Sequence, residues 1–148
     1  MRTYYWVEPG KLAAGPHPRA ERVQELLDAG ITAFVDLTHA GELDAYDRLI
    51  GDAVHHRRSI GDFGVPTDEA LTETLDLIDR LQAEGHAVYV HCWAGVGRTG
   101  TVVACHLIRH GMESGEALAR IAKLREEIGR YDASPEMPEQ RALVERWR

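Results

Sequence analysis

The sequence predicts an α/β fold in which one central sheet of about four to five strands, mixed but mainly parallel, has helices on both faces. Two observations support this class. Short apolar segments with strand character alternate with helical segments through the middle of the chain, and amphipathic helical segments follow to its end. The 148 residues suffice for one domain with a sizeable core, and no repeat or linker divides them. We therefore expect a single domain spanning residues 1–148.

The first half of the chain has four segments with strand character and one with helix character. The strands are short, apolar or β-branched, and separated by Gly or Pro turns. The expected strands cover residues 4–7, 11–14, 31–37 and 53–60, and the expected helix covers residues 19–29. The last of these strands contains the run His55-His56-Arg57-Arg58, so we expect it at an edge. The polar segment 38–51 leaves open a loop or a short helix around residues 43–49.

The second half of the chain predicts four helices around one further strand. Thr67 can cap the first helix, and the acidic residues that follow it suit the positive end of the helix. The apolar run at residues 87–90 is typical of a buried strand. The remaining helices are expected over residues 101–110, over residues 114–128, and from residue 134 to the C-terminus.

Charge and composition exclude several classes of protein. The 17 basic and 24 acidic residues give a formal net charge of −7, which argues against a protein that binds nucleic acid or a membrane surface. The first residues lack the apolar core of a signal peptide, and no apolar run is long enough to span a bilayer. The two cysteines, Cys92 and Cys105, are too few for a disulfide scaffold. We expect a monomer in the reducing cytoplasm, without nucleic-acid or membrane partners.

Ten consecutive residues, His91-Cys92-Trp93-Ala94-Gly95-Val96-Gly97-Arg98-Thr99-Gly100, indicate the chemistry of this protein. They follow a predicted strand and precede a predicted helix, so a glycine-rich loop leads into a helix N-terminus. Backbone N–H groups of such a loop converge on an anion, and the helix dipole favours negative charge there. The residues predicted to bind phosphate are Trp93, Ala94, Gly95, Val96, Gly97 and Arg98.

Cys92, near the start of this loop, is the candidate nucleophile, because helix N-termini, arginine and backbone amides favour an ionised cysteine. Thr99 can donate a hydroxyl hydrogen bond to its sulfur, and His91 is expected to order the loop through hydrogen bonds to neighbouring backbone. Arg98 offers a planar fork that matches two phosphate oxygens at once. Cys105 lies among apolar residues and is expected in the core; the alternative is a disulfide with oxidised Cys92.

The motif His91-Cys92-x-x-Gly95-x-x-Arg98-Thr99-Gly100 resembles the signature of the cysteine-based protein tyrosine phosphatases, including their compact dual-specificity branch. The resemblance implies an aspartate that serves as general acid on a separate upstream loop. Asp62 in the segment Asp62-Phe63-Gly64-Val65-Pro66 is similar to that loop, although Ile60-Gly61 stands where classical members have Trp-Pro. Gln140 is similar to a glutamine that orients the hydrolytic water in this family; the alternative is an ordinary residue in the first turn of a helix.

The resemblance also implies a mechanism. Cys92 attacks the phosphorus of a phosphomonoester, Asp62 protonates the leaving oxygen, and water hydrolyses the resulting phosphocysteine with Asp62 acting as base. Arg98 and the loop amides stabilise the charge on the transferring group, so we expect no metal and no other cofactor. The neutral side chains at the variable loop positions favour a singly phosphorylated protein or peptide. Phosphotyrosine is the first candidate substrate, and phosphoserine and phosphothreonine are the alternatives.

Other interpretations of the same residues are weaker. The spacing Gly95-x-Gly97-x-x-Gly100 matches a dinucleotide-binding fingerprint, which needs a second strand ending in an acidic residue about twenty residues later. Residues 117–127 predict a helix instead. A module that binds phosphorylated residues without hydrolysing them would be expected to lose the nucleophile or the acid. The pairs His55-His56 and His106/His110 have metal-ligand spacings, but no carboxylate pattern nearby in the sequence completes a site, so we expect structural or exposed histidines.

Overall fold

A five-stranded sheet in the order β1-β2-β5-β3-β4 organises the computed structural model, which describes residues 2–148. Its strands are β1 (Tyr5–Glu8), β2 (Leu12–Gly15), β3 (Ala33–Asp36), β4 (Val54–Arg57) and β5 (Val88–His91). The first two pair in antiparallel fashion, and every other neighbouring pair is parallel. This confirms the predicted mixed, mainly parallel sheet, and the polar strand β4 lies at its edge as expected.

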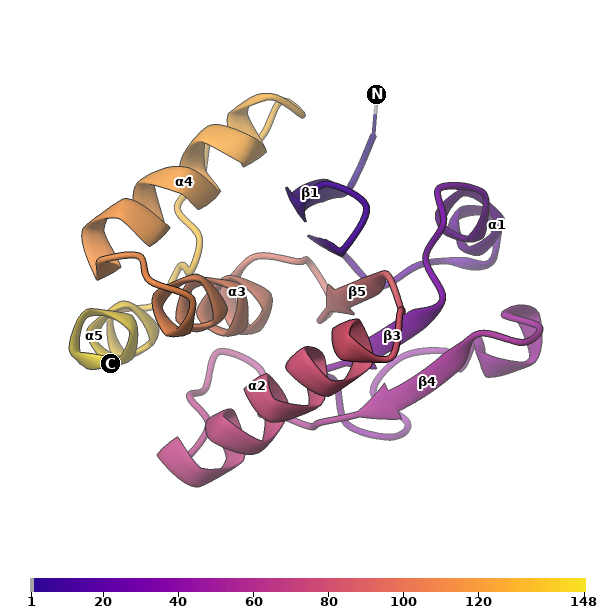
Figure 1. The fold of residues 1–148 in the computed structure, drawn as a ribbon, viewed down its shortest axis with the longest axis horizontal. Coiled ribbons are helices and arrows are strands. Elements are labelled where there is room, and N and C mark those ends of the chain that lie inside the picture. The colour runs from indigo at the N-terminus through magenta and orange to yellow at the C-terminus, as the bar shows by residue number, and fades with distance from the viewer. Residues whose placement is uncertain (1) are drawn as a thin grey trace.

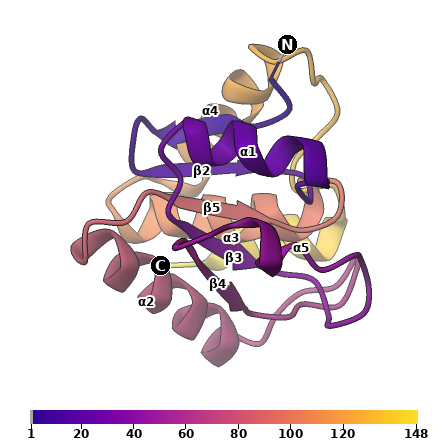
Figure 2. The same ribbon diagram turned by 90° about the vertical axis from the view of Figure 1, so that its right-hand side faces the viewer.

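Helices cover both faces of this sheet (Figure 1). They are α1 (Ala20–Asp28), the short 3₁₀ helix η1 (Asp47–Leu49), α2 (Asp68–Ala83), α3 (Gly97–Arg109), α4 (Ser114–Glu126) and α5 (Pro138–Arg146). Side chains of α1 and of the segment around η1 join one apolar cluster, whereas α2 to α5 contribute to a larger one. Figure 2 shows α1 in front of the strands and α3 and α5 behind them. The predicted α/β architecture is therefore confirmed.

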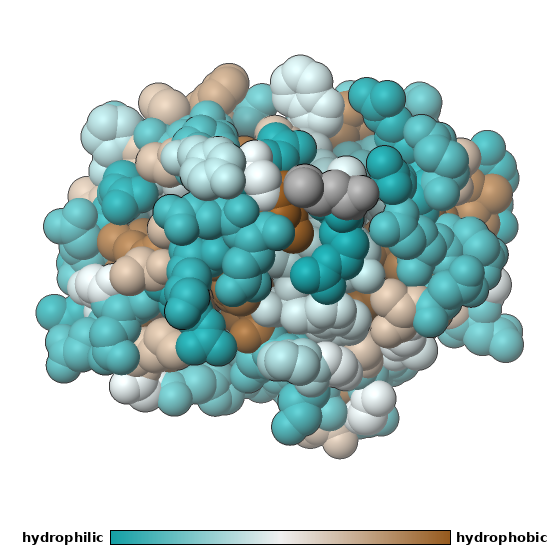
Figure 3. All heavy atoms as spheres, turned by 90° about the horizontal axis from the view of Figure 1, so that it is seen from above, coloured by the Kyte–Doolittle hydropathy of each residue, from teal (hydrophilic) through white to brown (hydrophobic). Residues whose placement is uncertain are grey.

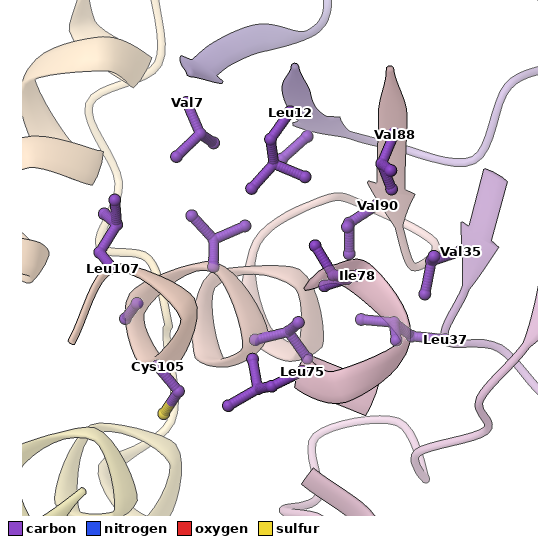
Figure 4. Close-up of a cluster of buried hydrophobic side chains, with 14 of the residues drawn as sticks. Val7, Leu12, Val35, Leu37, Leu75, Ile78, Val88, Val90, Cys105 and Leu107 are labelled. Atoms are coloured by element: carbon purple, nitrogen blue, oxygen red, sulfur yellow. The ribbon is translucent and has the colours of Figure 1, made fainter. Parts of the chain in front are cut away.

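The alternation of side chains along the central strands separates these two clusters. Val35 and Val90 belong to the larger cluster, whereas their neighbours Phe34 and Tyr89 belong to the smaller one. Figure 4 shows Val35 and Val90 on the side of the strands that faces α2 and α3. It also shows Cys105 pointing away from the strands toward α5. Cys105 is fully buried, as predicted, and burial raises the pKa of its thiol to about 12.

Two helices begin at other residues than the sequence predicts. α3 begins at Gly97 rather than at residue 101, so Arg98 and Thr99 lie in its first turn. The glycines of this segment have low helix propensity, which led to the prediction of a longer loop. α5 begins at Pro138, a residue type favoured at the first helical position, rather than at Ser134. Ser134 instead contacts the loop before α3, where its hydroxyl donates to the Val96 carbonyl at 2.6 Å.

The surface is mainly polar on the face shown in Figure 3, where apolar side chains appear as small separate areas between hydrophilic ones. Among the large apolar side chains that are exposed, Phe63 and Trp93 lie in the two loops that the sequence associates with catalysis. Of the helices that the structure describes, none combines the length and apolar character needed to cross a membrane.

Candidate active site

The candidate site lies where two parallel strands, β3 and β5, end side by side. The register places Asp36 at the end of β3 opposite His91 at the end of β5. The loop of residues 92–96 continues from β5 into α3, and the polar segment 37–46 continues from β3. The edge of a parallel sheet where its strands end is the usual place for a ligand site in α/β proteins. The topology therefore brings these two loops together at a favourable position.

The sulfur of Cys92 is surrounded by hydrogen-bond donors. Its Sγ accepts a hydrogen bond from the backbone N–H of Gly95 at 3.3 Å and another from the Thr99 hydroxyl at 3.0 Å. Cys92 is only 3% exposed and lies at the N-terminal end of α3. The structure thus places the predicted nucleophile and its predicted hydroxyl donor in contact.

Two glycines allow this loop to pack closely against neighbouring segments. Gly95 has φ +76°, and a Cβ added there would lie 2.3 Å from the carbonyl carbon of Gly15 at the end of β2. A Cβ on Gly100 would lie 2.3 Å from Oγ of Ser134. No larger side chain fits at either position without displacement of these neighbours. The loop is therefore held between β2 on one side and the segment before α5 on the other.

The His91 side chain contacts the backbone at the start of this loop. Its Nδ1 lies 3.0 Å from the Cys92 carbonyl, and its Nε2 lies 2.5 Å from the Tyr46 hydroxyl. The ring is fully buried, and burial lowers its pKa to about 4, so the neutral form prevails at neutral pH. In that form Nδ1–H donates to the carbonyl, and Nε2 accepts from Tyr46. This contact with neighbouring backbone is the one the sequence predicts.

Arg98 is anchored by a carboxylate that the sequence analysis did not identify. Its guanidinium is almost fully buried, and Nη1 and Nη2 donate to the two oxygens of Glu42 at 3.0 and 2.8 Å. Nη1 also donates to the Ile60 carbonyl at 3.0 Å. Burial opposes the charge of Arg98, but the hydrogen bonds to Glu42 raise its pKa. The Nη1–Nη2 edge is therefore occupied, and the Nε–Nη2 edge remains for two oxygens of a phosphate.

Asp62 reaches the same guanidinium from the loop of residues 61–66. Its Oδ1 lies 3.3 Å from Nη2 of Arg98 and accepts a hydrogen bond from the Phe63 N–H at 3.0 Å. The loop turns tightly there, with φ +61° at Phe63 and a hydrogen bond from the Gly64 N–H to the Gly61 carbonyl. The Asp62 side chain is 41% exposed. The predicted acid therefore lies at the entrance of the phosphate loop, open to solvent.

Gln140 lies between the two loops. Its Nε2 donates to the Gly64 carbonyl at 3.1 Å, and its Oε1 accepts from the Met137 N–H at 3.1 Å. A Cβ added to Gly97 would lie 2.9 Å from the same Oε1. The side chain is fully buried, although it stems from the first turn of α5. Of the two alternatives left open by the sequence, this placement favours a role in the site.

The other predicted phosphate-binding residues line the loop as the sequence suggests. Trp93 and Ala94 are exposed, and the Trp93 carbonyl accepts a hydrogen bond from the His17 N–H at 2.9 Å. Val96 and Gly97 are buried where the loop enters α3. The loop thus presents its first residues to solvent and anchors its last ones in the protein.

Glu42, Tyr46 and Asp36 support the site but carry no sequence signature. Glu42 and Tyr46 belong to the polar segment after β3, which the sequence left ambiguous between loop and helix. Asp36 accepts hydrogen bonds from His55 at 3.0 Å and from the Thr38 hydroxyl at 2.6 Å. Burial opposes its ionisation, but these bonds hold its pKa well below the usual range. Only their position could have indicated a role, because the segments that follow parallel strands line ligand sites in α/β proteins.

A carboxylate lies beside the pair of histidines that have metal-ligand spacing. The sequence around His106 and His110 shows no carboxylate pattern that completes a site, but ligand atoms of these residues and of Asp79 all lie within 4.8 Å of one another. The sequence could not show this, because Asp79 belongs to α2, whereas His106 belongs to α3 and His110 caps its C-terminal end. The packing of these helices brings the three side chains together.

Comparison with known proteins places this geometry in a family. A family model described as the DSP-PTPase phosphatase domain of Swiss Army Knife proteins (PTP-SAK) matches residues 1–146. The human dual specificity protein phosphatase CDC14C is 32% identical over 129 residues, which cover 77% of this chain and 28% of that protein. The chain spans 17–42% of the length of eight curated relatives that it matches.

Solved structures show the same fold over nearly the whole chain. The active form of Tk-PTP superposes with a TM-score of 0.81 at 28% identity, covering 96% of this chain and 93% of that one. PTPMT1 in complex with PI(5)P superposes with a TM-score of 0.80 at 26% identity, covering 97% and 93% of the two chains. The predicted resemblance is thereby confirmed, and the chain belongs to the DSP-PTPase phosphatase domain family.

Proposed function

We propose that this protein hydrolyses phosphomonoesters through a phosphocysteine on Cys92. Its preferred substrate in this proposal is phosphotyrosine in a protein or peptide. Asp62 serves as general acid in the first step and as general base in the second. The observation that carries the proposal is the convergence of three groups. Two donors point at the Cys92 sulfur, Arg98 keeps one donor edge unoccupied by Glu42, and Asp62 lies 3.3 Å from that arginine.

In the first step, phosphate oxygens bind the Nε–Nη2 edge of Arg98 and the amides of the loop. The Cys92 thiolate attacks phosphorus in line with the ester oxygen, so an S–P bond forms as the P–O bond breaks. Asp62 transfers its proton to the departing oxygen, a contribution of about 100- to 10,000-fold in rate. The buried guanidinium and the helix N-terminus stabilise the charge on the transferring group.

In the second step, water attacks the phosphocysteine and Asp62 accepts a proton from it. The S–P bond breaks, and the Cys92 thiolate leaves with the Thr99 hydroxyl and the Gly95 N–H as its donors. Gln140 is suited to hold the attacking water, because its amide lies against both Gly97 and the loop that carries Asp62. These residues account for both steps without a cofactor.

We also propose that residues 1–148 act as one phosphatase domain, as a monomer in the cytoplasm. One chain supplies every group in the scheme, so a second copy is not needed. Cys92 and Cys105 are both free thiols. A reducing compartment would maintain Cys92 in the reactive form that the mechanism needs.

Hydrolysis of p-nitrophenyl phosphate and of a phosphotyrosine peptide in excess chelator tests the proposal. We expect turnover by the wild type and none by Cys92→Ser, with a burst of phenolate before steady state if the phosphocysteine accumulates. Cys105→Ala is the matched control, because this cysteine is buried in the core, and it should retain activity. A wild-type protein that binds the phosphopeptide without turnover would refute the enzyme and support a binding module.

A phosphorylated lipid is a second candidate substrate, favoured by one further feature of the site. A cavity of about 790 Å³ adjoins the phosphate loop at Trp93. Its walls include the basic residues Arg19, Arg48 and Arg130, together with the acidic residues Glu21, Glu25 and Asp44. Such a cavity can accommodate a second anionic group beyond the reacting phosphate. PTPMT1, whose structure contains PI(5)P, has the same fold. Comparison of kcat/KM for a phosphotyrosine peptide and for PI(5)P in mixed micelles distinguishes the two, and Arg48→Ala should lower only the lipid value if lipid is the substrate.

A further inference from the structure

A cluster of metal-ligating side chains lies at the other end of α3 from the phosphate loop. His106 lies in the last turn of α3, and His110, four residues later, is the residue that caps this helix, so the two rings lie on the same side of its C-terminal end. Asp79 approaches them from α2, and His110 Nε2 lies 2.8 Å from its Oδ1. His106 lies nine residues after Gly97, about 14 Å along the helix axis. The cluster is thus separate from the site that binds phosphate.

The buried ring of His106 has one nitrogen with a hydrogen-bond partner and one without. Its Nε2 lies 3.1 Å from Oε1 of Glu8, which in turn accepts a hydrogen bond from Gln82 at 2.9 Å. Its Nδ1 is buried and has no hydrogen-bond partner among the residues that the structure describes. Because a carboxylate only accepts hydrogen bonds, Nε2 carries the proton, and Nδ1 of the neutral ring presents a lone pair. That nitrogen lies 3.8 Å from Oδ1 of Asp79.

The hydrogen bonds around these three side chains and the distances between their ligand atoms are also typical of a metal centre. A metal-binding histidine usually donates its other N–H to a carboxylate, as His106 does to Glu8. In a tetrahedral zinc site with bonds of about 2.0–2.1 Å, ligand atoms lie about 3.3 Å apart. The two histidine nitrogens lie 2.8 and 3.8 Å from Asp79 Oδ1, on either side of that value. Arg109 binds the other oxygen, Oδ2, so that Oδ1 is the carboxylate oxygen that faces both histidines, and it pairs with His110 Nε2 at 2.8 Å.

We propose that His106 Nδ1, His110 Nε2 and Asp79 Oδ1 bind one divalent transition-metal ion, with zinc as the ion that this donor set fits best. Two imidazole nitrogens and one carboxylate oxygen suit zinc and leave a fourth position for water. The ion joins α2 to α3, and Glu8 connects it to the end of β1. Its role is structural, because it lies far from Cys92 and stabilises the contact between the two helices that cover the sheet.

Titration with Co²⁺ tests the site directly, because tetrahedral Co²⁺ absorbs visible light. The experiment uses the full chain with Cys92→Ser, so that the thiolate cannot bind the ion and no phosphatase activity is needed. We expect one Co²⁺ per chain and displacement of its absorption band by equimolar Zn²⁺. His110→Ala removes a half-exposed ligand and should abolish the band, whereas the exposed His39→Ala is the matched control and should leave it unchanged.

Two further measurements keep the proposal testable if a ligand variant folds poorly. Glu8→Gln leaves all three ligands in place and should weaken Co²⁺ binding about 10- to 100-fold. Zn²⁺ at one hundred times its dissociation constant should raise the melting temperature of the Cys92→Ser protein by about 5–10 °C. His110→Ala should remove that increase. Absence of a Co²⁺ band, or a band that persists in His110→Ala, would overturn the proposal, whatever the outcome for the phosphatase activity.

Discussion

Substitution of Glu42 by Gln should reduce phosphatase activity, because Glu42 positions Arg98. Glu42 accepts two charge-assisted hydrogen bonds from Arg98, at 3.0 and 2.8 Å, and the arginine is only 1% exposed. The glutamine amide keeps one acceptor and places an N–H₂ group against the other guanidinium nitrogen. Loss of one such bond costs about 1.5–3 kcal/mol. If that energy positions Arg98 for the transition state, kcat/KM for p-nitrophenyl phosphate falls about 10- to 150-fold.

A second readout separates positioning from a general loss of stability. Vanadate binds the phosphate loop without needing the general acid, so its inhibition constant should rise in parallel with the loss of kcat/KM. Glu84→Gln, which removes an exposed carboxylate at the end of α2, is the matched control and should change neither value. The reasoning is refuted if Glu42→Gln folds with an unchanged denaturation midpoint and keeps kcat/KM and vanadate inhibition within twofold of the parent.

Three further predictions follow from the same geometry. Asp62→Asn should lower kcat about 100- to 10,000-fold and remove the alkaline limb of a bell-shaped pH–rate profile whose maximum lies below pH 7; an unchanged limb would exclude Asp62 as the acid. Gly95→Ala should cost about 100-fold in kcat/KM, because its Cβ would lie 2.3 Å from backbone. Gly85 also has a positive φ, +93° against +76° at Gly95, but open space around it, so Gly85→Ala should retain activity. Burial lowers the pKa of His91 to about 4 in the folded protein, against 6.5 for a free side chain, so the unfolded chain binds more protons between these pH values. The free energy of unfolding should therefore fall by up to about 3 kcal/mol as the pH drops from 6.5 to 4. Urea denaturation at several pH values measures this dependence, which should be weaker in His91→Gln.

The phosphate loop could be predicted in detail because its determinants are contiguous in the sequence. A strand, a cysteine, three glycines and an arginine within a few residues define both the turn and its chemistry. Asp62 needed more than local reasoning, because nothing in its own segment distinguishes an acid from an ordinary turn residue. Only the resemblance to a phosphatase family connected it to Cys92, and the structure places it 3.3 Å from Arg98.

Residues that depend on packing between distant segments could not be predicted. Glu42 lies in a polar segment without periodicity, and its partner Arg98 follows 56 residues later. Asp79 is one of several acidic residues on the polar side of α2, and only the packing of α2 on α3 directs it toward His106. The start of α5 was misplaced for a similar reason. Ser134 resembles a helix cap in sequence, but its hydroxyl is held by the Val96 carbonyl of the phosphate loop.

The two edges of Arg98 connect binding to proton transfer in the proposed reaction. Glu42 occupies one edge throughout, which keeps the guanidinium charged and fixed in a buried position. Asp62 lies near the other edge, facing a cation, in the absence of substrate. In the proposed reaction, a phosphate dianion that binds the remaining edge of Arg98 is placed beside Asp62, so one arginine positions both the phosphate and the acid. Binding through Arg98 would thus bring the leaving oxygen of the substrate to the carboxyl group that the proposed mechanism uses as its proton donor.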